Sequence, residues 1–184
     1  FAAKNPAAAK LFEIIKLNIN DVSAQNMMMS RGKNSSADIS PTAGQMPRLL
    51  GLALASKVYR EHPELNKIEA FKKFTNSGNE VAFGTIGDAS TSEGPFWETI
   101  NAAGVLQVPM VMSVWDDGYG ISVSREHQTT KDSISEALAG MQRTADKPGF
   151  EIFVTKGWDY AHLVLTYEKA ARIAREEHVP VLVH

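Results

Sequence analysis

The sequence contains no cysteine, which excludes a disulfide framework, a zinc site built from thiolates and a cysteine nucleophile. Basic charge is not in excess either, because 19 lysines and arginines stand against 21 aspartates and glutamates, and the formal net charge is −2. Proteins that bind nucleic acid or a membrane surface usually carry basic clusters. No apolar run approaches the roughly 20 residues that span a bilayer. We therefore expect a cytoplasmic protein with no nucleic-acid partner and no membrane partner.

The proportions of apolar and charged residues are those of an ordinary globular domain. The chain has 184 residues, of which 43% are hydrophobic and 22% are charged. This length suits one domain with a sizeable core. The chain begins at Phe1 rather than at an initiator methionine, and no signal-peptide pattern follows. We expect residues 1–184 to form a single domain that is a fragment of a longer or processed chain.

Helical and strand-like patterns alternate along the sequence. Apolar residues recur at helical spacing in 6–19, 43–59, 63–74, 93–106, 133–144 and 159–177. Continuous apolar runs, typical of buried strands, cover 81–86, 108–114, 150–155 and 179–183. Residues 20–38 are polar and irregular, which predicts a loop. Because helices alternate with apolar strands, we expect a three-layer α/β/α fold with a mainly parallel sheet.

Two polar, glycine-containing turns follow consecutive predicted strands. The first begins with Gly87 and Asp88, and the second with Asp116 and Asp117. Ligands of open α/β sheets bind at the carboxyl ends of the strands, so we expect Asp88 and Asp117 to converge there. Two carboxylates suit Mg²⁺, which takes oxygen ligands and often bridges to phosphate. The alternatives are a helix-capping role for Asp88 and an ordinary turn at residues 116–118.

The two turns together resemble the motif of thiamine diphosphate enzymes, in which Gly-Asp-Gly is followed after roughly thirty residues by an Asn-Asn-like pair. Residues 87–109, followed by Asp-Asp-Gly-Tyr-Gly-Ile-Ser at 116–122, are similar to the α-type half of the 2-oxoacid dehydrogenase family. The similarity runs from about residue 38 to 184. Segments 128–138 and 150–160 resemble the branched-chain type, 2-oxoisovalerate dehydrogenase. The resemblance implies the thiamine diphosphate-binding fold.

The resemblance also implies the residues of a cofactor site. Asp88 and Asp117 would bind Mg²⁺ through their side chains, and Tyr119 through its backbone carbonyl. Ala89 departs from the third glycine of the family motif, although its N–H remains available to a phosphate. Ser40 and Thr42 align with residues whose backbone meets the aminopyrimidine ring, and a simple pre-helix turn is the alternative there. The implied cofactor-binding residues are Gly87, Asp88, Ala89, Ser90, Asp117, Tyr119, Ser40 and Thr42.

No catalytic residue is assigned from the sequence. The family carries a catalytic histidine in the loop before its Ser-Pro segment, where this chain has residues 29–32, Met-Ser-Arg-Gly. His127 follows the second turn and is the best functional candidate among the five histidines, although a surface role is favoured even there. His184 ends the sequence directly after a predicted strand.

The resemblance implies a domain that binds thiamine diphosphate and Mg²⁺ and works in the oxidative decarboxylation of a branched-chain 2-oxoacid, with acyl transfer to a lipoyl group. It implies a β-type domain or subunit that supplies the pyrimidine side of the site, a lipoyl acyltransferase component and an oligomer. The isolated chain should then be inactive. A transketolase-like or acetoin-cleaving thiamine enzyme is an alternative, and a non-catalytic nucleotide- or Mg²⁺-binding module is another. For that module, neither a P-loop nor a Gly-x-Gly-x-x-Gly fingerprint is present.

Overall fold

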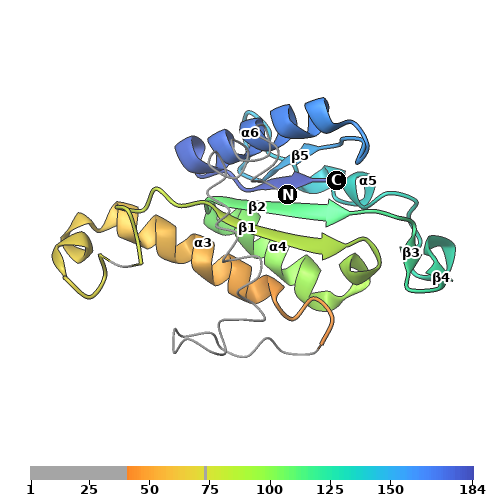
Figure 1. Cartoon of the computed structure of the whole chain (residues 1–184), viewed down its shortest axis with the longest axis horizontal. Helices are drawn as coiled ribbons and strands as arrows, with labels where there is room; N and C mark the ends of the chain where they lie inside the picture. The colour runs from red at the N-terminus through yellow and green to blue at the C-terminus, as the bar shows by residue number, and fades with distance from the viewer. Residues whose placement is uncertain (1–40, 73) are drawn as a thin grey trace, which may run out of the picture.

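The computed structural model describes residues 41–72 and 74–184 (Figure 1). Three predictions fall outside these residues: the helix at 6–19, the loop at 20–38 and the cofactor contact of Ser40. Among the described residues, no helix combines the length and apolar character that a membrane crossing requires.

The centre of the fold is a four-stranded sheet in which every strand pair is parallel. The strands are β1 (Ala82–Gly87), β2 (Met110–Trp115), β5 (Glu151–Phe153) and β6 (Val181–Val183), in the spatial order β1-β2-β6-β5. The predicted parallel sheet is therefore confirmed, with strand bounds within two residues of those expected. A small antiparallel hairpin of β3 (Tyr119–Gly120) and β4 (Val123–Ser124) follows β2.

Helices cover both faces of the sheet and make three layers, as predicted. Figure 1 shows α3 (Met46–Glu61) and α4 (Gly94–Leu106) on one face and α6 (Tyr160–Glu177) on the other. Strand β2 explains this arrangement, because Met112 packs into the cluster with α3 and α4 while its neighbour Val111 packs against α6. Successive side chains of a strand point to opposite faces. A central strand whose first five residues are all buried must therefore be covered on both sides.

Two of the predicted helices are wrong in length. Of the described residues in this range, 63–72 and 74, only Pro63–Lys67 form a helix, the short 3₁₀ helix η3, and turns follow it. None of the residues of η3 is buried, so this segment has no packed apolar face to stabilise a longer helix.

The helix expected at 133–144 ends early for a different reason. It is limited to α5 (Ile134–Ala137) and the 3₁₀ turn η6 (Ala139–Met141). Beyond that point, Arg143 donates its N–H to the carbonyl of Phe150 at 3.1 Å, so the backbone pairs with the approach to β5 instead of continuing the helix. Ser133 caps the start of α5, because its Oγ accepts the N–H of Glu136.

Candidate functional site

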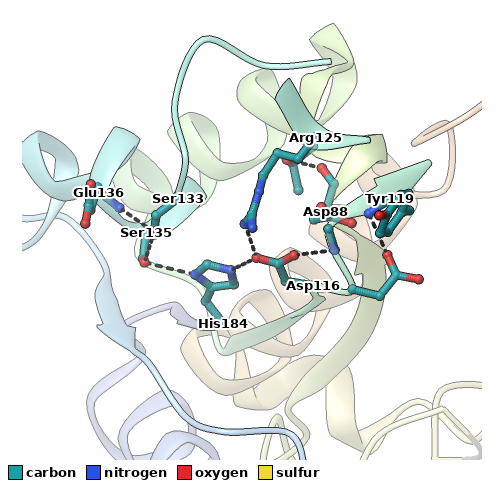
Figure 2. A network of polar contacts seen from close by, with 11 residues as sticks. Asp88, Asp116, Tyr119, Arg125, Ser133, Ser135, Glu136 and His184 are labelled. Carbon is teal, nitrogen blue, oxygen red and sulfur yellow. Dashed lines mark hydrogen bonds and ion pairs between the residues drawn. The ribbon is translucent and has the colours of Figure 1, made fainter. Parts of the chain in front are cut away.

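The polar residues of the site follow the carboxyl ends of three adjacent strands. Asp88 follows β1, Asp116 follows β2 and His184 follows β6. The last residues of β1 and β2, Gly87 and Trp115, are register partners, and the N–H of Asp88 donates to the carbonyl of Trp115 at 3.1 Å. Figure 2 shows the side chains gathered at this edge. Parallel pairing therefore brings together residues that are far apart in the sequence.

Asp88 is buried, with 8% of the residue exposed. Its backbone begins the short 3₁₀ helix η4 (Ala89–Ser92), but its side chain makes no capping hydrogen bond to that helix. Burial raises the pKa of Asp88, the N–H of Ala89 opposes that rise, and the nearby carboxylates of Asp116 and Asp117 reinforce it. A divalent cation would stabilise a carboxylate whose charge is disfavoured in this way by burial and by two neighbouring acidic side chains.

Asp116 is tied to three groups. Its Oδ2 accepts a hydrogen bond from Arg125 Nη1 at 2.6 Å and lies 3.0 Å from His184 Nε2, while its Oδ1 accepts the N–H of Gly118 at 2.8 Å. Burial by itself raises the pKa of Asp116, but the hydrogen bonds from His184 and Gly118 and the charge of Arg125 outweigh burial and hold the pKa below its usual value. Asp116 is thus the stabilised carboxylate of the pair, and Asp88 is the destabilised one.

The two aspartates after β2 also shape the turn that carries the other predicted metal ligands. Asp117 Oδ1 accepts the N–H of Tyr119 at 3.0 Å. Like Asp116 with Gly118, Asp117 thus binds the backbone N–H two residues later. Gly118 has a positive φ of 76°, a conformation that glycine adopts without strain. The turn interpretation of residues 116–118 is therefore correct as geometry, and it leaves the second oxygen of Asp117 and the carbonyl of Tyr119 available to a cation.

The remaining predicted cofactor residues lie in or near the same edge, with one exception. Gly87 is exposed at the end of β1, and a side chain there would meet open space. Ala89 packs against the second turn, since a Cβ added to Gly120 would lie only 2.8 Å from the Ala89 methyl carbon. Ser90 is half-buried in η4. Thr42 is exposed in the turn before α3, and no described contact joins it to Asp88.

An open groove of about 1020 Å³ runs over the carboxyl ends of β2, β6 and β5. Its lining includes Trp115, Asp117, Lys156, Trp158 and His184. A much smaller cavity of about 20 Å³, close to the volume that one water needs, is bounded in part by Asp88, Asp116, Arg125 and His184. The groove has the size of a small-molecule or cofactor site, and the cavity beside Asp88 has the size of a single ion or water.

Within the described part of the chain, no three histidine or acidic side chains already surround a point where a metal ion would sit. Mg²⁺ in phosphate sites is usually held by one or two carboxylates together with phosphate oxygens and water, and does not need an all-protein cage. Asp88, Asp117 and the Tyr119 carbonyl are oxygen groups of the kind that such a site uses.

Three members of the polar network were missed by the sequence analysis. Arg125 and Ser135 gave no signal in the sequence, because their partners are distant along the chain. His184 did give a signal, since it directly follows an apolar strand, and a residue in that position lies at the ligand-binding edge. His127, the best functional candidate among the histidines, lies on the surface, as the favoured interpretation expected, with 71% of its side chain exposed beside Glu126.

The chain is similar to known proteins over most of its length. The model of the family described as dehydrogenase E1 component matches residues 13–184. The chain is 26% identical to the 2-oxoisovalerate dehydrogenase subunit alpha of Bacillus subtilis over 144 residues. This alignment covers 78% of this chain and 36% of that protein.

Two further similarities are of other kinds, one short and one to a solved structure. A stretch of 39 residues, 21% of this chain, is 62% identical to 12% of the glycine betaine/proline betaine-binding periplasmic protein of Salmonella typhimurium. Among solved structures, a transketolase from Pichia stipitis aligns with a TM-score of 0.56 and 19% identity, over 78% of this chain and 19% of that chain. The transketolase alignment shows the shared fold. The chain spans 12% of the length of the periplasmic protein and 36% of the length of the Bacillus subtilis subunit.

Proposed function

The chain belongs to the dehydrogenase E1 component family, and from that premise we propose that it is the domain that binds the diphosphate and Mg²⁺ in a thiamine diphosphate-dependent 2-oxoacid dehydrogenase. The observation that carries the proposal is the convergence of Asp88 with the turn of Asp116 and Asp117 at the carboxyl edge of adjacent parallel strands. Asp88 follows β1 and the turn follows β2, so the arrangement is a product of the fold and not of local sequence.

The described residues fit a diphosphate held through a divalent cation. Asp88 is buried, its side chain makes no helix-capping bond, and neighbouring carboxylates raise its pKa, so a cation there would relieve repulsion. We assign Asp88, Asp117 and the Tyr119 carbonyl as metal ligands. Backbone groups of Gly87, Ala89 and Ser90 would face the diphosphate. The open space at Gly87 supports a close approach to this end of β1.

When bound, thiamine diphosphate supplies the electron sink for decarboxylation of a 2-oxoacid. The residues of this chain bind and orient. Asp88 and Asp117 hold the cation, and the groove over β2, β6 and β5 provides a wall of aromatic and aliphatic side chains beside it. No residue of the described network is assigned a proton-transfer step, and catalysis would need groups from a partner.

The substrate and the partners form the finer part of the proposal. We assign a branched-chain 2-oxoacid as substrate and a lipoyl group as acyl acceptor, supported by the similarity to the subunit of Bacillus subtilis. A β-type domain or subunit would supply the pyrimidine side of the site, and a lipoyl acyltransferase component would take the acyl group. We further propose an oligomeric assembly, a cytoplasmic location and no activity of the chain without its partner.

The test is a calorimetric titration of the full chain with thiamine diphosphate, ATP and NAD, each with and without Mg²⁺. We expect thiamine diphosphate to bind only with Mg²⁺. Asp88→Asn should weaken that binding at least about 10-fold, since it removes a charged ligand of the cation. Asp146→Asn, which changes an exposed aspartate outside the site, is the matched control and should bind as the unaltered chain does. Tighter binding of ATP or NAD, or unchanged binding by Asp88→Asn, would refute the proposal and favour the nucleotide-binding alternative.

The substrate assignment has its own assay. With the β-type partner present, CO₂ release should be faster from 3-methyl-2-oxobutanoate than from pyruvate. A preference for pyruvate would overturn the branched-chain assignment and leave the cofactor assignment standing.

A further inference from the structure

The carboxylate of Asp116 joins parts of the chain that are distant in sequence. It accepts from Arg125 Nη1 at 2.6 Å and lies 3.0 Å from Nε2 of His184. Arg125 also donates its backbone N–H to the carbonyl of Gly118 at 2.9 Å. The turn after β2 is therefore held at its first side chain and at its backbone by groups that lie outside it.

A continuous line of hydrogen bonds extends from Asp116 to the first turn of α5. His184 Nδ1 lies 2.9 Å from Ser135 Oγ, which lies 2.8 Å from Ser133 Oγ. Ser133 Oγ in turn accepts the N–H of Glu136. Figure 2 shows the imidazole of His184 between Ser135 and Asp116, with Arg125 reaching the same carboxylate.

The partners at the two ends give this line one direction. A carboxylate only accepts, so His184 carries its proton on Nε2 and donates it to Asp116. Nδ1 of the same ring can then accept from the Ser135 hydroxyl, and Ser135 accepts from Ser133. Ser133 accepts the helix N–H, so every donor in the line has an acceptor. Both ring nitrogens of His184 are thus engaged, and the ring orientation is determined.

The Ser-His-Asp composition does not make this line a nucleophilic site. Ser135 has only 8% of its surface exposed, and it lines neither the groove nor the small cavity. Its hydroxyl is shared between His184 and Ser133. A nucleophile must reach a substrate, and Ser135 has no such access.

We propose that His184, oriented by Ser135, is a positioning residue for the cation-binding turn. It orients Asp116, and Asp116 together with Arg125 holds the backbone of Gly118. That backbone leads directly to Tyr119, whose N–H is bound by Asp117. The network thereby presents the Asp117 carboxylate and the Tyr119 carbonyl to the cation beside Asp88. This inference rests on the proposed function, because it assigns the network a role toward the cation.

The experiment measures Mn²⁺ affinity of the full chain in the presence of thiamine diphosphate, from the electron paramagnetic resonance signal of free Mn²⁺. His184→Ala should weaken Mn²⁺ binding about 10-fold, the size usual for residues that orient metal ligands. His184→Gln keeps an N–H donor within reach of Asp116 and should restore most of that loss. His162→Ala removes an exposed histidine that bonds only Thr155 and should leave the affinity unchanged.

Ser135→Ala removes one hydroxyl from the far side of the ring and should weaken Mn²⁺ binding in the same direction by a smaller factor. Urea unfolding of each variant shows whether it is folded. If His184→Ala does not fold, Ser135→Ala replaces it as the test of the positioning role. Asp88→Asn separates the two claims. If it keeps full Mn²⁺ affinity, the proposed function fails. If it abolishes binding while His184→Ala or Ser135→Ala binds normally, or if His184→Gln is as weak as His184→Ala, the positioning role is overturned.

Discussion

Gly120 is the position at which one added methyl group tests the contact between the two turns of the site. It lies in β3, directly after the turn of Asp116 to Tyr119. A Cβ at this residue would lie 2.8 Å from the Cβ of Ala89 and would also strike the side-chain amide of Gln128. Real Cβ contacts are essentially never shorter than 3.0 Å. In Gly120→Ala the hairpin must therefore move away from the turn that carries Asp88.

The cost follows from these contacts. Forcing a methyl into a packed contact typically destabilises a protein by about 1–3 kcal/mol. Gln128 Nε2 donates to the carbonyl of Val123 at 2.6 Å, and displacing that amide adds about 1 kcal/mol. The same displacement moves the Tyr119 carbonyl relative to Asp88, so we expect Mg²⁺ and thiamine diphosphate to bind more weakly as well.

The assay combines urea unfolding with calorimetric titration of the cofactor, and its control is a rescue. Ala89→Gly removes the opposing methyl group, so the double variant should recover part of both the stability and the affinity lost in Gly120→Ala. The coupling between contacting residues should be at least about 0.5 kcal/mol. Gly51→Ala, where an added Cβ meets nothing within 4 Å, should stabilise helix α3 slightly. Unchanged stability in Gly120→Ala, or no recovery in the double variant, would refute the proposed contact between the turns.

Two other predictions concern charge and backbone conformation. Asp116 has a lowered pKa in the folded chain, so its contribution to stability is present above its ordinary pKa of 3.8 and is lost as the pH falls through the lower folded value. Asp116→Asn should therefore reduce the free energy of unfolding at pH 7 and make that free energy decline less steeply in acid. An unchanged pH profile of unfolding, measured by circular dichroism, would contradict this. Gly78 has a φ of +72°, and a Cβ there would lie 2.5 Å from both the N of Arg60 and the carbonyl O of Ser56. Gly78→Ala should therefore destabilise the chain by more than about 1 kcal/mol in thermal unfolding. The control Gly140→Ala adds a Cβ in open space and should leave the stability unchanged.

Much of the fold could be read from the sequence because strong apolar periodicity decided it. All four predicted strands exist, and the three long helices, α3, α4 and α6, end within three residues of their expected limits. The two shortened helices had correct local patterns but no matching tertiary partner. In η3 no residue is buried, and at 141–144 backbone pairing with the approach to β5 replaced the helix. Local pattern is therefore reliable only where the rest of the chain supplies a surface to pack against.

The sequence by itself determined the parallel sheet, its burial on both faces and the edge that carries Asp88 and the turn of Asp116 and Asp117. These follow from the alternation of helices and apolar strands along the chain and from the rule that ligands of such sheets bind at the carboxyl ends of the strands. Only the tertiary structure decided that Asp116 is held by Arg125 and His184, that Ser135 orients that histidine and that His127 faces solvent. The reason is physical: a strand or helix pattern depends on neighbours a few residues apart, whereas a hydrogen bond between Asp116 and His184 depends on the lateral order of the strands, which adjacent residues do not encode.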